Sequence, residues 1–302
     1  MLVSERPGSY HSNLEMTPLY LLSANAFSPF TEVESWGPSL LISEFAKKNG
    51  LRYDVPDWEL VKKFNSKQFS FEMSPKLPGS ALLSYLSQAE QWLRSISGPK
   101  VLKSCYGVSG KGHLIIEEAT PREKILRFLQ LEWSKGLLVL AEPWVERLMD
   151  FSTQWVIHKN TQVEYLGSTL CTNDARGAYR YSTVGDEKVL FKEPFLNVHK
   201  EIAKPVLHQM AKAGYFCNVG IDAMLYLSDK KEPTLHPIVE INARKTMGWA
   251  ALCFQRQHHP EDLVRFSFQL GSGGYLPESI IASTGKIFSF ERNLFIDVLS
   301  KN

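Results

Sequence analysis

The stretch NVGIDAMLYLSDKKEPTLHPIVEINAR, residues 218–244, decides the fold of this chain. Two apolar segments flank a polar turn, SDKKEP, and this pattern is typical of an antiparallel β-hairpin. The predicted strands are Asn218 to Leu227 and Thr234 to Asn242. When the turn pivots at Lys231, Asp222 on the first strand faces Glu240 on the second. The hairpin therefore predicts two carboxylates opposite each other on one sheet face.

Two facing carboxylates predict a cation, because neighbouring acids repel unless a positive charge lies between them. Side chains alternate along a strand, so Glu240, Asn242 and Arg244 share one face while the isoleucines point to the other. Carboxylate and amide oxygens suit Mg²⁺ rather than Zn²⁺, so we expect Asp222, Glu240 and Asn242 to bind Mg²⁺, with Mn²⁺ as a second candidate. Arg244 would then reach an anion beside the metal. A hairpin with two solvated acids is the alternative.

A glycine-rich segment, YGVSGKGH at residues 106–113, lies between two apolar stretches that predict strands at 99–103 and 113–117. Glycines let backbone N–H groups approach phosphate oxygens, so the segment is typical of a flap over a nucleotide. Lys103 stands just before it on a strand that is otherwise apolar. Its ammonium group needs a partner, and a phosphate would supply one. An ordinary hairpin turn, with a lysine that reaches water, is the alternative.

The strand predicted at residues 136–141 is followed by Glu142, Pro143, Trp144 and Val145. A proline at this point ends the ladder of hydrogen bonds and frees backbone groups. Free backbone groups, a carboxylate and an aromatic side chain suit the edge and the face of a purine, so we expect this segment to bind a base. The alternative is a simple strand exit with an exposed tryptophan.

The rest of the chain mixes helices and strands, and hairpins outnumber β-α-β units, which favours an α+β fold with antiparallel sheets. Apolar residues at helical spacing predict helices at 38–48, 57–64, 80–95, 123–133 and 198–213. Asp57 is the expected cap of the second helix, and Thr120 with Glu123 form the expected capping box of the fourth. Further strands are expected at 19–22, 154–158 and 164–169, with a loop at 172–183.

The composition describes a chain long enough for one large core or two modest ones, with 302 residues, 44% of them hydrophobic, and a net charge of +2. The four cysteines lie far apart, which argues against a thiolate zinc module and a disulfide scaffold. The near-neutral charge argues against nucleic acid and membranes as partners, and no apolar run is long enough to span a bilayer. With no signal-peptide pattern at the amino terminus, we expect a cytoplasmic protein.

Taken in chain order, these motifs resemble the ATP-grasp superfamily. The matching positions are Lys67 followed by a leucine-proline-glycine stretch, Lys103, the loop GVSGKG, the segment EPWV, the strand GID and the motif EINAR, an E-x-N-x-R pattern similar to that of biotin-carboxylase-like members. The resemblance covers residues 67–247. It implies two α+β subdomains that clasp ATP, with a reduced Rossmann-like region before them. The implied boundaries are 1–66 for that region, 67–142 for the small lid subdomain and 143–302 for the carboxy-terminal subdomain with the metal site.

The same resemblance implies a role for each candidate site residue. Lys67 and Lys103 would contact the phosphates, with Ser109 and Gly110 on the flap above them. Glu142 would bind the adenine amino group, the backbone of Trp144 and Val145 the ring edge, and Asp150 the ribose. Asp222, Glu240 and Asn242 would hold Mg²⁺, and Arg244 and Lys103 would be the catalytic residues.

The reaction that the resemblance implies is an ATP- and Mg²⁺-dependent ligation. A carboxylate attacks the γ-phosphate of ATP, and the resulting acylphosphate is captured by an amine or another nucleophile, with release of ADP and phosphate. Positioning and charge neutralisation suffice for this chemistry, so no nucleophilic side chain is needed. A non-catalytic ATP-binding module and a phosphotransferase that uses the same site stay open as alternatives. The oligomeric state is not predicted.

Two departures from the family's pattern are visible in the sequence. Many amide-forming members have an arginine two residues before the metal aspartate, where this chain has Gly220. Arg176 or Arg180, in the loop predicted before it, is the candidate substitute. Only 66 residues precede Lys67, which shortens the region that commonly helps to bind the acid. The acid and the nucleophile therefore stay unassigned.

Overall fold

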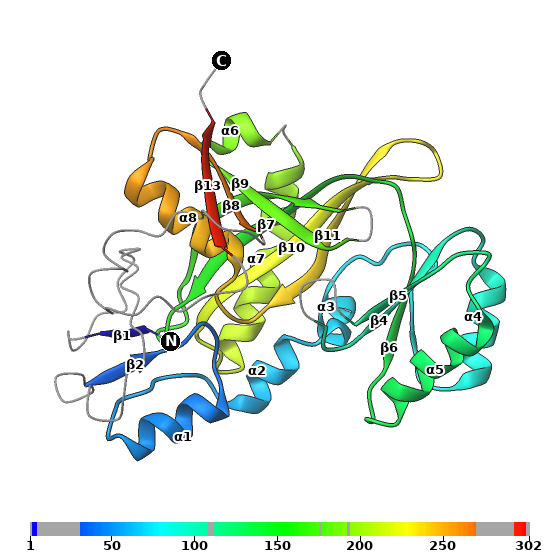
Figure 1. The fold of residues 1–302 in the computed structure, drawn as a ribbon, viewed down its shortest axis with the longest axis horizontal. Coiled ribbons are helices and arrows are strands. Elements are labelled where there is room, and N and C mark those ends of the chain that lie inside the picture. Colours follow the sequence, from blue (N-terminus) through cyan, green and yellow to red (C-terminus); the bar gives the residue numbers. More distant parts are fainter. Residues whose placement is uncertain are drawn as a thin grey trace.

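A seven-stranded sheet runs through the centre of the computed structural model and carries the hairpin discussed above (Figure 1). The structure describes residues 2–4, 31–107, 112–174, 177–191, 194–269 and 293–299. The predicted strand at 19–22 and residues 108–111 of the glycine-rich segment lie outside these described residues.

Long antiparallel hairpins build the central sheet. Its strands are β7 (Arg147–Ile157), β8 (Val163–Asn173), β9 (Tyr179–Val184), β10 (Cys217–Leu227), β11 (Pro233–Asn242), β12 (Leu263–Gln269) and β13 (Asn293–Leu299), in the order β11-β10-β7-β8-β9-β12-β13. The β10–β11 hairpin forms, with Lys231 in its turn at φ 60°, but the predicted pivot is wrong. Next to the turn Leu227 pairs with Pro233, which centres the turn on Lys230. A bulge between Asp222 and Met224 shifts the register so that Asp222 faces Glu240. β7 and β8 are longer than predicted and β9 occupies part of the predicted loop at 172–183, because pairing with neighbouring strands draws polar residues such as Ser152 and Thr172 into the sheet.

A smaller four-stranded sheet forms a second lobe, at the right of Figure 1. Its strands are β3 (Ala81–Leu83), β4 (Lys100–Ser104), β5 (His113–Ile116) and β6 (Val139–Pro143), in the order β3-β6-β4-β5, and the helices α4 (Leu86–Ser95) and α5 (Arg122–Trp133) pack on it. Leu83, Leu102 and Leu129 are fully buried in the core between this sheet and its helices.

Two helix starts in this lobe differ from the predictions. The helix expected at residues 80–95 begins only at Leu86, because Ala81–Leu83 pair with β6 as a strand. The capping box expected at Thr120 and Glu123 is wrong, since Pro121 is the N-cap of α5 and the Thr120 hydroxyl accepts a hydrogen bond from the Glu117 backbone N–H at 2.9 Å. A short apolar run does not distinguish an edge strand from the first turn of a helix.

Two helices cover the two faces of the central sheet. The helix predicted at 198–213 is confirmed as α7 (Phe195–Lys212), which follows the short α6 (Glu187–Leu190) and buries Ala203 and Leu207 against apolar strand residues such as Ile221. The chain leaves α7 through Gly214, whose φ of 95° suits glycine. The other face is covered in part by α8 (Met247–His258), whose Leu252 lies over Gly167 of β8.

The amino-terminal part supplies β1 (Leu2–Ser4), β2 (Glu32–Glu34), α1 (Leu40–Lys48), α2 (Trp58–Phe64) and α3 (Lys67–Met73). α1 and α2 confirm two predicted helices, and the Asp57 side chain caps α2 by accepting from the Glu59 N–H at 2.9 Å. α3 lies against β11, where the Ile241 N–H donates to the Ser70 hydroxyl at 2.9 Å. Lys67, at the start of α3, is thereby brought to the β10–β11 hairpin.

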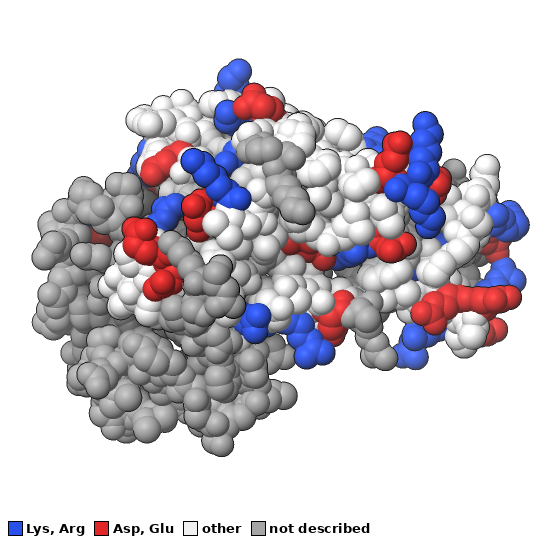
Figure 2. Space-filling model, turned by 90° about the horizontal axis from the view of Figure 1, so that it is seen from above, with Lys and Arg blue, Asp and Glu red and all other residues white. Residues whose placement is uncertain are grey.

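The surface visible in Figure 2 carries acidic and basic side chains interspersed with one another. Within the described ranges, every helix is too short or too polar to span a bilayer. Two further lysine–glutamate pairs lie away from this surface, a partly exposed one on β11 and a buried one in the small sheet.

Candidate functional site

Asp222 lies within the central sheet between two partners. The register pairs it with Glu240 on β11 and with Ser152 on β7. The predicted facing of Asp222 and Glu240 is therefore confirmed. Because opposite residues of an antiparallel pair project from the same face, the three side chains share one side of the sheet.

The environment of Asp222 disfavours its negative charge. Burial, followed by the charge of Glu240, raises the pKa of Asp222 from 3.8 to about 6. The shift is opposed by the Ser152 hydroxyl, by the charge of Arg244 and by the Asn242 amide, whose Nδ2 donates to Oδ2 of Asp222 at 3.0 Å. A divalent cation between the two carboxylates would offset this penalty.

Asn242 and Arg244 complete one side of the site. β11 ends at Asn242, and the chain turns so that the Arg244 N–H donates to the Asn242 carbonyl at 2.8 Å. The turn directs the Arg244 guanidinium back toward the strand end, where Nη2 donates to Oδ1 of Asn242 at 2.7 Å. The Asn242 amide is thus held at both ends, by Arg244 and by Asp222.

Lys67 reaches the carboxylates from α3. Its Nζ donates to Oε1 of Glu240 at 2.6 Å, and only 11% of its side chain is exposed. The turn before α3 is held against β11 by Asn65, whose side-chain oxygen accepts from the Ala243 N–H at 2.9 Å. The Ser66 hydroxyl then caps α3 by accepting from the Phe69 N–H. Lys67 therefore pairs with a carboxylate at the place where a phosphate contact is predicted.

Lys103 forms the second lysine–glutamate pair, with Glu142 of the neighbouring strand β6. Its Nζ lies 2.5 Å from Oε2 of Glu142, and the two side chains are 12% and 6% exposed. Burial acts to raise the pKa of Glu142, but the Lys103 ammonium and its hydrogen bond lead the effects that hold the pKa below its usual value. The expected anionic partner of Lys103 is this carboxylate in the structure.

A pocket lies between the small sheet, α3 and β11. Its lining residues are Phe71, Ser74, Lys76, Leu140, Glu142, His236, Ile238 and Val239. His236 is buried, and burial lowers its pKa although the nearby Glu142 acts in the opposite direction. Apolar walls with a carboxylate and an imidazole suit a heterocyclic base. The sequence analysis missed His236, whose signal is a histidine inside the apolar stretch 235–239.

The expectation that Pro143 ends pairing at the base-binding segment is wrong. Pro143 and Glu142 are paired residues of β6, opposite Lys100 and Val101 of β4. The Trp144 backbone N–H donates to the Pro99 carbonyl at 2.9 Å, so this donor is already used. The strand is extended because it lies between β3 and β4, where its neighbours continue the ladder.

The side chains after β6 lie near the central sheet. The Trp144 ring faces the Arg147 guanidinium, whose Cζ is 5.3 Å from the ring centroid. Val145 packs on a cluster formed by Leu77, Met224 and Tyr226. Contact of Val145 with a base stays a prediction.

Asp150 is held on β7, two residues before Ser152, by two donors. Nη1 of Arg147 lies 3.3 Å from its carboxylate, and Nδ2 of Asn173 donates to Oδ2 at 2.9 Å. Its place on the same sheet face as Ser152 is compatible with the ribose contact, which stays a prediction. The flap residues Ser109 and Gly110 lie outside the described residues.

Packing explains the glycine at position 220. A Cβ atom there would lie 2.5 Å from Cγ2 of Thr246 and 3.1 Å from Oε1 of Gln154. An arginine side chain therefore has no room at this position. Of the two candidate substitutes, Arg180 is exposed on β9, and Arg176 lies outside the described residues.

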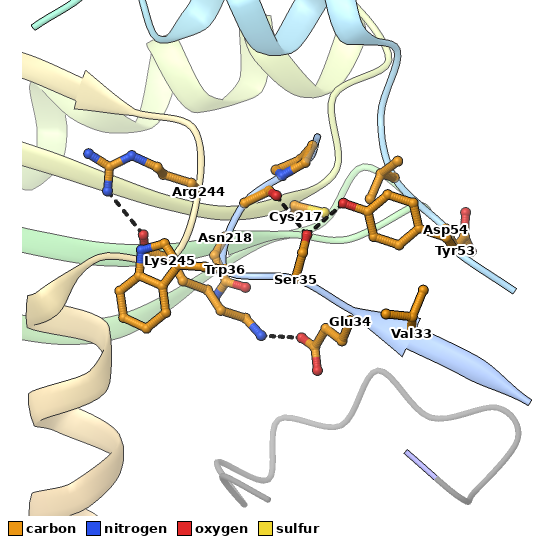
Figure 3. A pocket seen from close by; sticks show the side chains of 13 residues that line it. Val33, Glu34, Ser35, Trp36, Tyr53, Asp54, Cys217, Asn218, Arg244 and Lys245 are labelled. Atoms are coloured by element: carbon orange, nitrogen blue, oxygen red, sulfur yellow. Dashed lines mark hydrogen bonds and ion pairs between the residues drawn. The ribbon is translucent and has the colours of Figure 1, made fainter. Parts of the chain in front are cut away.

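A second pocket adjoins Arg244 (Figure 3). Its walls come from residues 33–38 and 53–55, from Cys217 and Asn218, and from Arg244 and Lys245. It holds about 350 Å³ of unfilled space, part of which is open to solvent. Trp36 and Tyr53 give it aromatic surface, and the Ser35 and Tyr53 hydroxyls are hydrogen-bonded at 2.6 Å. The sequence analysis singled out none of these amino-terminal residues as site residues.

The oxygen atoms at Asp222 fit a metal that arrives with a nucleotide. Across the described part of the chain, no group of three or more His, Cys, Asp or Glu side chains could hold a metal ion. Asp222 and Glu240 supply two carboxylates. The Asn242 amide turns its nitrogen to Asp222 and its oxygen to Arg244, so this oxygen binds a metal only if it leaves Arg244. Mg²⁺ commonly binds one or two carboxylates and completes its shell with substrate phosphates and water.

Comparison with known proteins identifies the fold. No protein-family model matches the sequence, and no curated protein is similar to it in sequence. The biotin carboxylase of Campylobacter jejuni, solved as a β-γ-ATP complex, matches with a TM-score of 0.56 at 14% identity, over 78% of this chain and 58% of that chain. N5-carboxyaminoimidazole synthetase of Staphylococcus aureus, complexed with ADP, matches with a TM-score of 0.52 at 10% identity, over 82% and 70%. A putative ATP-grasp superfamily protein of Archaeoglobus fulgidus matches with a TM-score of 0.50 at 13% identity, over 86% and 73%.

The chain has the ATP-grasp fold. The predicted α+β class with antiparallel sheets is confirmed. The chain spans a little more than half the length of the biotin carboxylase, 58%. At identities of 10% to 14% the likeness concerns the fold, so the activity must be argued from the site.

Proposed function

We propose that this protein is an ATP- and Mg²⁺-dependent ligase, which activates a carboxylate as an acylphosphate for attack by an amine or another nucleophile. The observation that supports the proposal most is the pairing of Asp222 with Glu240, with Asn242 bonded to the first and Lys67 to the second. Nucleotide-bound complexes among the structures of the same fold, with ATP or ADP, support the choice of ligand.

In this proposal Asp222, Glu240 and Asn242 hold Mg²⁺, which would neutralise phosphate charge and fix the geometry of the phosphates. Lys67 exchanges Glu240 for a phosphate when the nucleotide binds, since the pair is partly exposed and one ammonium can serve either anion. Lys103 contacts the phosphates from the small lobe. The pocket beside Glu142 and His236 receives the base.

The acid, in our proposal, occupies the pocket of Figure 3 next to Arg244. An oxygen of its carboxylate forms a bond to the γ-phosphorus, and the bond from that phosphorus to ADP breaks with its electrons remaining on ADP. The nucleophile then displaces phosphate from the acyl carbon and loses a proton. Arg244 orients the carboxylate and stabilises the charge that develops, so the chain needs no covalent catalyst.

A thermal-shift measurement tests the first part of the proposal. A ligand present at a hundred times its dissociation constant stabilises the folded state by about 2.7 kcal/mol, so ATP with Mg²⁺ should raise the melting temperature by several degrees. ATP with EDTA should raise it less. A Lys67→Met variant should lose much of the ATP response, whereas Lys204→Met, which removes an exposed lysine paired with Glu201, should keep it.

Product analysis tests the reaction and separates it from its alternatives. Release of ADP and phosphate only when an acid and a nucleophile are both present supports a ligase. A stable phosphorylated acceptor would show a phosphotransferase instead. Stabilisation by ATP with Mg²⁺ without turnover for any pooled acid and amine would show a binding module. Absence of any response to ATP with Mg²⁺ contradicts the proposal altogether.

A further inference from the structure

Ser152, Gln154 and Thr246 are buried polar residues next to Asp222, with exposed fractions of 3%, 1% and 8%. Burying such groups costs free energy unless each of them has a hydrogen-bond partner. All three find their partners in one row that begins at α8 and ends at the Asp222 carboxylate.

Each hydrogen bond in this row has a defined donor and a defined acceptor, starting at Thr246. The Thr246 hydroxyl accepts from the Trp249 N–H at 3.2 Å, as the N-cap of α8, and donates its own proton to Oε1 of Gln154 at 2.7 Å, because an amide oxygen can only accept. That bond orients the Gln154 amide, and Nε2 then donates to the Ser152 oxygen at 2.8 Å. The single Ser152 proton is left for Asp222, which faces Ser152 directly across the β7–β10 pair and whose pKa the Ser152 hydroxyl lowers.

Two glycines make room for the row. A Cβ atom on Gly220 would lie 3.1 Å from Oε1 of Gln154, and one on Gly248 would lie 2.7 Å from Nε2 of the same side chain. The Gln154 side chain, which is 1% exposed, is thus enclosed on both sides of its amide and hydrogen-bonded at both ends. A side chain with so little freedom can hold its neighbour Ser152 in one rotamer.

We infer that Ser152, Gln154 and Thr246 are positioning residues that orient the Asp222 carboxylate for the metal. The inference rests on the proposed function and adds to it three residues that would not touch metal or nucleotide. Ser152 and the Asn242 amide each occupy one lone pair of Asp222, so the remaining lone pairs are left for a cation next to Glu240. Each hydrogen bond in the row polarises the next one. The positive partial charge at the N-terminus of α8 therefore strengthens the donor that faces the Asp222 carboxylate.

Mn²⁺ binding, followed by electron paramagnetic resonance with saturating ADP, tests the inference without turnover. Ser152→Ala should weaken Mn²⁺ binding by about 10- to 100-fold, the range found when partners of metal ligands are removed. The affinity for ADP in EDTA should stay within about twofold of the unchanged protein, because the row does not contact the nucleotide.

Ser168→Ala is the matched control. Ser168 is also a fully buried serine of the central sheet that donates to a carboxylate, that of Glu187, at 2.7 Å. This variant removes the same hydroxyl at a place away from Asp222, so Mn²⁺ binding should not change. An equal loss of Mn²⁺ affinity in both variants would show a general structural effect and overturn the inference.

Thr246 provides a second, independent test at the far end of the row. Thr246→Val removes the hydroxyl at constant shape and should weaken Mn²⁺ binding several-fold, whereas Thr246→Ser keeps the hydroxyl and should restore it. If Ser152→Ala fails to fold, this pair decides the question. Unchanged Mn²⁺ affinity in Thr246→Val or in a folded Ser152→Ala overturns the inference while the proposed function stands. Failure of the unchanged protein to bind Mn²⁺ with ADP contradicts the proposed function itself.

Discussion

The two faces of β7 carry two hydrogen-bond chains that end differently. On the face under α7, Nε1 of Trp155 donates to the Thr153 hydroxyl at 2.8 Å, and that hydroxyl lies 2.7 Å from Nε2 of His199. Nδ1 of His199 lies 2.7 Å from the Pro237 carbonyl, which can only accept, so Nδ1 carries the proton and Nε2 accepts from Thr153. On the other face, the chain through Ser152 ends on the Asp222 carboxylate.

The His199 chain is a structural network in which every group is paired and neutral. The Ser152 chain ends on an acid whose negative charge its surroundings disfavour. The His199 chain ends on a neutral carbonyl, and burial lowers the pKa of His199 to about 4, so the ring stays neutral. The Ser152 chain ends on a carboxyl whose pKa burial and Glu240 raise to about 6. A buried polar network that is complete stabilises the fold, whereas one that converges on an uncompensated acid indicates a place for a cation.

The largest expected effect is that of Asp222→Asn. Loss of one carboxylate ligand should lower Mn²⁺ affinity in the presence of ADP, and ligase turnover, on the order of 100- to 1000-fold. The free energy of unfolding without metal should not fall, because the variant also removes a buried charge near Glu240. Calorimetric titration and urea unfolding measure the two quantities.

His199→Gln is the comparison variant on the opposite face. It should lower the free energy of unfolding by about 1–3 kcal/mol, since it disturbs a buried hydrogen-bond chain, and leave Mn²⁺ affinity unchanged. Equal loss of metal binding in both variants would contradict the separation of the two faces.

The pH dependence of stability should have opposite signs on the two faces. A pKa raised from 3.8 to about 6 means that Asp222 stabilises the metal-free fold at low pH and that up to about 3 kcal/mol is lost as pH rises from about 4 to 6. A pKa lowered from 6.5 to about 4 means that His199 contributes about 3 kcal/mol that is present above pH 6.5 and lost as pH falls toward 4.

The contributions of Asp222 and His199 to the pH dependence of stability nearly cancel in the unchanged protein. Each contribution is therefore visible only in a variant that removes the other one. Between pH 4 and 6, Asp222→Asn should become more stable with rising pH relative to the unchanged protein, and His199→Gln less stable. Urea unfolding at five pH values measures both slopes. Parallel curves for the two variants would show that neither group titrates as its surroundings indicate.

The smallest expected effect is a coupling energy of about 1 kcal/mol between Gly220 and Thr246, next to the Ser152 chain. Gly220→Ala places a methyl group 2.5 Å from Cγ2 of Thr246 and should cost about 1–3 kcal/mol of stability. Thr246→Ser removes that Cγ2 atom, so the cost of Gly220→Ala should fall by about 1 kcal/mol in the Thr246→Ser background. A double-mutant cycle measures the coupling. Strictly additive effects would contradict the view that the Thr246 side chain is the reason for a glycine at position 220.

Much of the site could be predicted where the pattern is local. Alternation along β10 and β11 was enough to predict that Asp222 and Glu240 share one sheet face, but their direct pairing also depends on the bulge between Asp222 and Met224, which the local pattern did not predict. The small lobe was less predictable, because Ala81–Leu83 has no periodicity that distinguishes a strand from a helical turn and becomes a strand only by pairing with β6. Glu142 and Pro143 were expected at a strand exit for the same reason, since the neighbouring strand β4 extends the ladder past them.

By itself, the sequence determined the hairpin, the shared face of its two acids and the residue types at its edge, because side-chain alternation acts between neighbours in the chain. The register at Asp222 was decided by the bulge next to it. The tertiary structure alone decided which partners these residues have: Lys67 on Glu240, Lys103 on Glu142, and the row from α8 to Asp222. These contacts join segments far apart in sequence. Only the packing of α3, β6 and α8 around the central sheet brings them within hydrogen-bond distance. Burial then strengthens these hydrogen bonds and makes an unpaired polar group costly.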